Sequence, residues 1–63
     1  MDADQLYTVK EVEELLGLSR NVVLRLLNQG ELRGAKLGVR QWRIKGSDIL
    51  EYYERKASER RKD

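Results

Sequence analysis

The chain contains no cysteine, no histidine and no proline, and its aromatic residues are one tryptophan and three tyrosines. Without cysteine or histidine there is no disulfide, no thiolate or histidine-ligated zinc site and no imidazole base. The longest apolar runs are two or three residues, which excludes a membrane span. The acidic start, residues 1–5, lacks the apolar stretch of a secretory signal. We therefore expect a cytoplasmic protein that is not an enzyme and needs no metal or cofactor.

The length of 63 residues is sufficient for one domain and too short for two. A chain of this size buries only about 60% of the surface that it exposes when unfolded, so we expect modest stability. Hydrophobic residues make up 40% of the chain and charged residues 38%. This composition is typical of a globular domain with a heavily charged surface.

Charge is distributed unevenly along the chain, although the net charge is only +2. Residues 1–14 carry five acids and one base, which gives −4, whereas residues 19–45 carry seven bases and one acid, which gives +6. A basic segment of this kind is typical of a small domain with a nucleic-acid-binding face. A salt-bridged surface with chance clustering would give the same pattern, and charge alone does not separate the two interpretations.

Two helical segments with a short connection come first. Thr8 and Glu11 have the spacing of a capping box, and apolar residues at helical spacing then lead to Gly17, which can adopt the left-handed conformation after a helix. Ser19 is a favourable N-cap for a second helix over residues 20–29. A three-residue connection that begins with glycine is typical of a helix-turn-helix.

After residue 30 the periodicity changes. Residues 32–37 and 41–45 are predicted to be two strands joined by a tight glycine-containing turn. Because an isolated hairpin is marginally stable, we expect it to pack on the helices through Leu37, Trp42 and Ile44. A base-stacking role for Trp42 is the less favoured alternative, since its alternation with Ile44 indicates a core position.

A third helix is predicted to begin after Ser47 as its N-cap, with three apolar residues on its inner face: Ile49, Leu50 and Tyr53. Tyr7 and Tyr52 are expected to be partly exposed. The predicted fold class is mainly α with a small two-stranded β-hairpin. Residues 7–55 should form the domain, residues 1–6 a tail, and residues 56–63 a charged tail that frays because it has almost nothing to bury.

The exposed face of the second helix is the main candidate for DNA contact. On a wheel of about 100° per residue, Asn21, Arg25 and Asn28 lie opposite the apolar residue Val23. These side-chain types contact bases and phosphates, and Arg20 lies at the helix end that usually enters the major groove. A merely solvated face is the alternative, but asparagine is a poor helix former, so two on one face favour a function.

The predicted hairpin offers a second basic surface. A basic hairpin can follow phosphates or enter the minor groove, and it can also protect an exposed sheet edge from aggregation. Both roles are compatible. The expected DNA-binding residues are Ser19, Arg20, Asn21, Leu24, Arg25, Asn28, Lys36, Arg40, Gln41 and Arg43.

An ordered set of motifs runs through residues 6–54: Tyr7-Thr8-Val9-x-Glu11-Val12, Leu15-Leu16-Gly17-Leu18-Ser19-Arg20, Gly30-Glu31-Leu32, Lys36-Leu37-Gly38, Trp42-Arg43-Ile44 and Ser47-Asp48. This set resembles the excisionase-type winged helix-turn-helix domain, which is related to the MerR-type DNA-binding domain. The resemblance implies that helix 20–29 enters the major groove and that the wing, residues 36–43, contacts the minor groove or backbone. It also implies an excisionase-like recombination directionality factor or a small transcription regulator, associated with the nucleoid.

Four residues depart from the pattern of that family. Glu13 replaces a small residue, Val22 and Leu24 replace a threonine and an aromatic that touch the DNA backbone, and Val39 replaces a basic residue of the wing. They motivate an alternative, a protein-interaction adaptor on the same scaffold with weak or no DNA binding. On the first hypothesis the partner is double-stranded DNA, with further copies on adjacent sites or a recombinase or regulatory protein. Neither a small-molecule ligand nor a membrane is expected.

Overall fold

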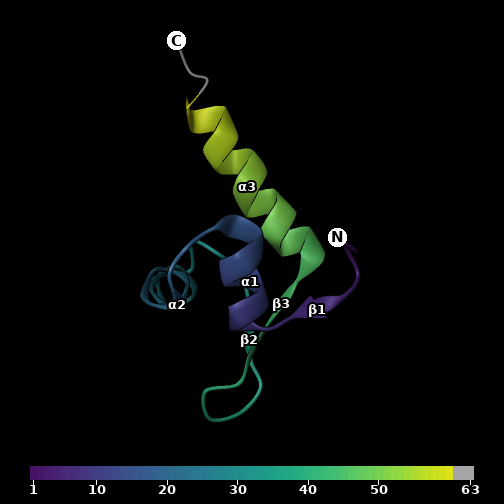
Figure 1. Ribbon diagram of the computed structural model, residues 1–63, viewed down its shortest axis with the longest axis vertical. Helices are drawn as coiled ribbons and strands as arrows, with labels where there is room; N and C mark the ends of the chain where they lie inside the picture. The colour runs from purple at the N-terminus through teal and green to yellow at the C-terminus, as the bar shows by residue number, and fades with distance from the viewer. Residues whose placement is uncertain (61–63) are drawn as a thin grey trace.

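The computed structural model describes residues 1–60. Three helices and a small three-stranded antiparallel sheet form a mainly helical fold that is consistent with a winged helix-turn-helix (Figure 1). The elements are β1 (Leu6–Tyr7), α1 (Val9–Leu16), α2 (Arg20–Gln29), β2 (Ala35–Lys36), β3 (Trp42–Lys45) and α3 (Gly46–Arg60). The predicted fold class is confirmed, but the sheet has a third strand, β1, that the sequence did not indicate.

The first two helices begin and end where their capping residues predict. The Thr8 hydroxyl accepts the Glu11 N–H at 3.2 Å, and the Glu11 carboxylate accepts the Thr8 N–H at 2.9 Å. The Ser19 hydroxyl accepts a backbone N–H from the first turn of α2 at 3.3 Å. Gly17 and Gly30 end the two helices with φ values of 68° and 80°, in the left-handed region that glycine adopts without steric cost.

Strand β3 is the centre of the sheet, with β1 and β2 as its neighbours. The predicted strands 32–37 and 41–45 are both longer than the observed β2 and β3. The first begins late because the N–H groups of Glu31 and Leu32 still donate to the Leu26 carbonyl at the end of α2. Leu32 is fully buried and so contributes to packing rather than to the sheet.

The N-terminal segment, residues 1–6, contacts the start of α3. The Gly46 N–H donates to the Gln5 carbonyl at 2.9 Å, and the Ser47 N–H donates to the Ala3 carbonyl at 2.8 Å. The prediction of Ser47 as N-cap is therefore wrong, since α3 already begins at Gly46. Backbone carbonyls of the N-terminal segment satisfy the first N–H groups of the helix in place of a capping side chain.

A single core lies between the helices and the sheet. It consists of Tyr7, Val9, Val12, Val23, Leu27, Leu32, Ile44 and Ile49. Trp42 and Tyr52 are half-buried and pack against it, as expected of Trp42. Tyr7, expected to be partly exposed, is only 9% exposed because β1 places it opposite Ile44 on the central strand.

Three apolar residues expected to pack are instead exposed: Leu37 at 66%, Leu50 at 42% and Tyr53 at 57%. Leu37 lies beyond β2, where the hairpin extends away from the helices (Figure 1). On α3 only a narrow stripe meets the core, and it passes through Ile49 and Tyr52 rather than Tyr53.

Helix α3 extends beyond the predicted domain end at residue 55 and reaches Arg60. Figure 1 shows its C-terminal half projecting away from the other elements. Residues 61–63 of the expected fraying tail lie outside the described part of the chain. Within residues 1–60, no helix has the length and apolar character needed to span a membrane.

Candidate nucleic-acid interface

The outward face of α2 is polar, as the helical wheel predicts. Val23 and Leu27 are buried, whereas Asn21, Arg25 and Asn28 are exposed. The Asn28 amide nitrogen donates to the carbonyl of Leu24 one turn earlier, at 2.9 Å. This bond fixes the direction of the Asn28 side chain and leaves its carbonyl oxygen free to accept from another group.

A hollow of about 510 Å³, here called the first groove, lies between the start of α1, the face of α2 and the hairpin. Five bases line it, and no acid does: Lys10, Arg20, Lys36, Arg40 and Arg43. Thr8, Val9, Leu24, Asn28 and Trp42 complete its lining. A concave surface with charge of one sign concentrates the electrostatic potential, so this groove attracts an anionic ligand.

The first groove brings together six of the ten predicted DNA-binding residues: Arg20, Leu24, Asn28, Lys36, Arg40 and Arg43. The other four, Ser19, Asn21, Arg25 and Gln41, are exposed but do not line it. Lys10 lines the groove and was missed by sequence reasoning, because it is a single base within the acidic N-terminal segment. Lys10 lies in the first turn of α1, directly after Thr8. Because α1 packs beside α2, this position brings the Lys10 side chain to the edge of the α2 face.

The hairpin turn has an unusual backbone at Arg40. The Leu37 N–H donates to the Gln41 carbonyl at 2.8 Å, which leaves a three-residue loop between them. The left-handed position of this loop falls on Arg40, with φ of 62°, and not on the glycine at position 38. Left-handed backbone is unfavourable for a side chain with a Cβ, and such residues cluster at functional sites.

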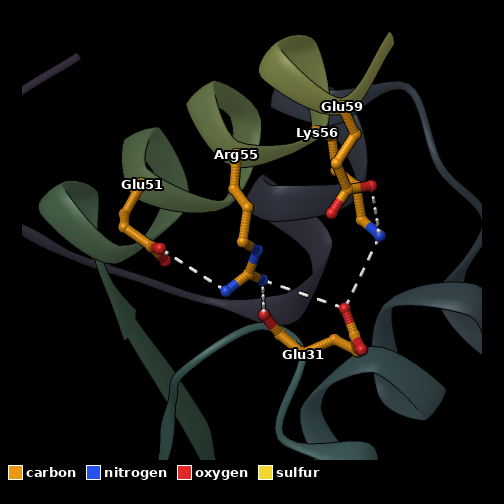
Figure 2. A network of polar contacts seen from close by, with 5 residues as sticks. All are labelled: Glu31, Glu51, Arg55, Lys56 and Glu59. Atoms are coloured by element: carbon orange, nitrogen blue, oxygen red, sulfur yellow. Dashed lines mark hydrogen bonds and ion pairs between the residues drawn. The ribbon is translucent and has the colours of Figure 1, made fainter. Parts of the chain in front are cut away.

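The ion pairs of the described residues involve two cations only, Arg55 and Lys56 of α3 (Figure 2). None of the seven bases in residues 19–45 pairs with a described carboxylate. The salt-bridged surface considered from the sequence therefore does not describe this segment. The cations near α2 and the hairpin thus carry uncompensated charge, although Arg43 donates to the Trp42 carbonyl at 2.8 Å and the Lys36 ammonium lies 6.0 Å from the centre of the Trp42 ring.

The one acid of the basic segment, Glu31, is itself paired. Its carboxylate lies 3.9 Å from the Arg55 guanidinium and 3.6 Å from the Lys56 ammonium, and Arg55 also donates to the Glu31 carbonyl (Figure 2). The Glu59 carboxylate, with a smaller contribution from Glu31, raises the pKa of Lys56 above its usual 10.5. Helix α3 thus places two positive charges beside the only negative charge of the segment.

The positions that depart from the expected pattern differ in environment. Val22 and Leu24 are half-buried, and Leu24 packs against the core. Glu13 is also half-buried, and its carbonyl accepts N–H groups from Gly17 and Leu18 in the turn between the helices. Val39 is 85% exposed. Only Val39 is therefore fully available at the surface.

A family model for the helix-turn-helix domain matches residues 6–57, which includes both helices, the hairpin and most of α3. The chain belongs to the helix-turn-helix domain family. No curated protein and no solved structure matches it. Family membership supports a small DNA-binding protein, and the family is typically not enzymatic. Among residues 1–60, no three side chains of the types that ligate metals gather into a site.

Proposed function

We propose that this protein binds double-stranded DNA as a winged helix-turn-helix module, with α2 in the major groove and the hairpin on the minor groove or backbone. The first groove is the observation that carries this proposal. It lies between the two elements that would contact DNA, and five cations but no acid line it. A DNA backbone passing between α2 and the hairpin would bring its phosphates within reach of these cations.

The residues divide by where their side chains lie. Asn21 and Arg25 are exposed on α2 outside the first groove, which suits contact with base edges in the major groove. Lys10, Arg20 and Arg40 line the groove, which suits contact with phosphates. Base contacts would then determine sequence preference, and phosphate contacts would determine affinity and its salt dependence.

Binding to duplex DNA at several salt concentrations tests the proposal. With five phosphate contacts, the slope of log K against log salt concentration should be about −4 to −5, at about 0.9 per phosphate. Arg25→Ala should reduce sequence preference, whereas Arg40→Ala should weaken binding to all sequences alike. Ser58→Ala, at an exposed position of α3, is the control and should bind like the parent. A slope near zero for the parent would contradict DNA binding.

The proposed biological role is that of an excisionase-like recombination directionality factor or a small transcription regulator. Support comes from the resemblance of the motif order and from the helix-turn-helix family model that matches residues 6–57. A monomer of this size makes few contacts, so cooperation with further copies or with a recombinase or regulatory protein would strengthen binding. An excision assay on attachment-site DNA and a promoter reporter, run in parallel, separate the two roles.

A protein-interaction adaptor is the second candidate. One observation favours it: Leu37 and Val39 are 66% and 85% exposed on the hairpin. The partial burial of Val22 and Leu24 speaks against it, and Leu24 packs against the core. An NMR titration with random duplex DNA discriminates the candidates. Shifts in residues 20–28 and 38–43 support DNA binding, and an unchanged spectrum supports the adaptor.

A further inference from the structure

A second hollow, of about 470 Å³, lies on another side of the hairpin, between the end of α2, β3 and the start of α3. We call it the second groove. Its charged lining consists of Arg33, Arg43, Lys45 and Asp48. Leu27 and Leu32, both in the core, lie beneath it. Arg43 lines both grooves, so the two surfaces meet at the central strand.

The bases of the second groove are held by backbone that packs closely. Lys45 lies opposite Leu6 in the β1–β3 pairing, which fixes its position on the sheet. Arg33 precedes Gly34, where a Cβ would lie 3.1 Å from a side-chain carbon of Ile44. The chain therefore passes directly over the core at this point, with Arg33 exposed beside it.

Protection of a sheet edge does not account for Arg33, which lies between α2 and β2. Such protection explains a base on an edge strand, as at Lys36 on β2. Arg43 pairs with Ala35 of β2 and Lys45 with Leu6 of β1, each on one side of β3 only, whereas Arg33 lies outside the strands. Within the described residues, neither they nor Arg33 form an ion pair, and Asp48 is the one acid of the lining. Arg43 donates to the Trp42 carbonyl at 2.8 Å, so Arg33 and Lys45 are the bases of the second groove that no described side chain or backbone group engages.

We propose that the second groove binds the phosphate backbone of DNA beyond the segment held in the first groove. This inference rests on the proposed function. The polar lining of the second groove has arginine and lysine but no asparagine, glutamine or threonine. Such a lining suits contact with phosphates rather than recognition of bases. The phosphates come either from the same duplex, bent around the hairpin, or from a second duplex. Both sources present the same chemistry to Arg33 and Lys45.

The double variant Arg33→Gln/Lys45→Gln tests this site, and Lys36→Gln/Arg40→Gln, which removes the same charge from the first groove, is the matched control. Both are compared with the parent by fluorescence anisotropy on trace labelled duplexes of random sequence. One duplex has about 12 base pairs, slightly more than one turn, and the other has about 40. Circular dichroism confirms that each variant is folded.

If the phosphates come from the same duplex, the second-groove variant should match the parent on the short duplex only. On the long duplex its salt slope should be smaller by about 2, so the parent's advantage should be about tenfold greater at 50 than at 200 mM salt. If they come from a second duplex, the parent should co-capture two differently labelled duplexes at excess DNA, and the variant should not. The control should weaken binding to both lengths. If the double variant does not fold, Arg33→Gln alone repeats the test at an exposed side chain.

The inference would be overturned if the second-groove variant had the parent's salt slope on the long duplex and also captured two duplexes as the parent does. The proposed function would survive that result, because the parent would still bind DNA. A parent that binds neither duplex would instead contradict the proposed function itself.

Discussion

Arg40→Gly should make the protein more stable and its DNA binding weaker. Arg40 combines two properties that a substitution can separate. Its φ of 62° is in the left-handed region, which is unfavourable for a residue with a Cβ, and its side chain lines the first groove. Glycine adopts this conformation readily but carries no charge. The backbone conformation of Arg40 therefore lowers the stability of the protein, whereas its side chain strengthens DNA binding.

The magnitude follows from these two properties. A left-handed residue other than glycine costs roughly 1–2 kcal/mol, and the greater freedom of glycine in the unfolded chain offsets about 0.4–1 kcal/mol of the relief. Arg40→Gly should then raise the free energy of unfolding by about 0.5–1 kcal/mol, or roughly 2–8 °C in Tm for a domain of this size. The loss of one phosphate contact should reduce the salt slope of DNA binding by about 0.9.

Thermal unfolding by circular dichroism and anisotropy titrations on one duplex measure both effects. Arg40→Ala removes the charge and keeps the backbone cost, so it should weaken DNA binding without raising Tm. Arg40→Lys keeps both and should resemble the parent. An Arg40→Gly variant with a lower Tm than the parent, or with the parent's DNA affinity and salt slope, would refute these opposite effects of backbone and side chain.

Three further predictions concern the scaffold. Gly46→Ala should lower the free energy of unfolding by about 2 kcal/mol, measured by thermal unfolding. The new Cβ would collide with the Asp2 carbonyl and break two backbone hydrogen bonds between α3 and the N-terminal segment. In a chain without that segment, the same substitution should leave the stability unchanged. Leu32→Ala should lower stability by about 2–5 kcal/mol in a denaturant titration, since Leu32 is fully buried. Arg55→Gln should weaken DNA binding at low salt by unmasking the Glu31 charge, and should have little effect in a Glu31→Gln background.

The helix boundaries could be predicted because their signals are local. A capping residue and the N–H group that it accepts are three positions apart, so the hydroxyl of Thr8 or Ser19 determines its helix start without reference to the rest of the fold. Strand β1 could not be predicted in this way. It has two residues, and its partners Ile44 and Lys45 are far along the chain. The start of α3 depends on the same distant segment, so the local N-cap signal at Ser47 does not mark it.

The spacing of apolar residues on α3 does not determine which of its two tyrosines packs against the core. Tyr52 and Tyr53 lie three and four residues after Ile49, and both positions share a helix face with it. The orientation of α3 over β3 decides which of them packs, and Tyr52 does. The candidate site shows the same limit. The bases of α2 and the hairpin were predicted, but Lys10 enters the first groove only because α1 lies beside α2.

The ion pairs of α3 matter more for the electrostatic field than for stability. Exposed pairs contribute about 0–1 kcal/mol each, and the side chains of Glu31 and Arg55 are 46% and 38% exposed. Glu31 is, however, the only acid in residues 19–45, and it lies directly after α2. An unpaired carboxylate there would repel a phosphate backbone held by the neighbouring cations. Arg55 and Lys56 lie within 4 Å of that carboxylate and offset part of its charge, although each of them also pairs with an acid of α3, Glu51 or Glu59. The C-terminal half of α3, which adds little to the core, thereby lowers the negative charge beside the end of α2.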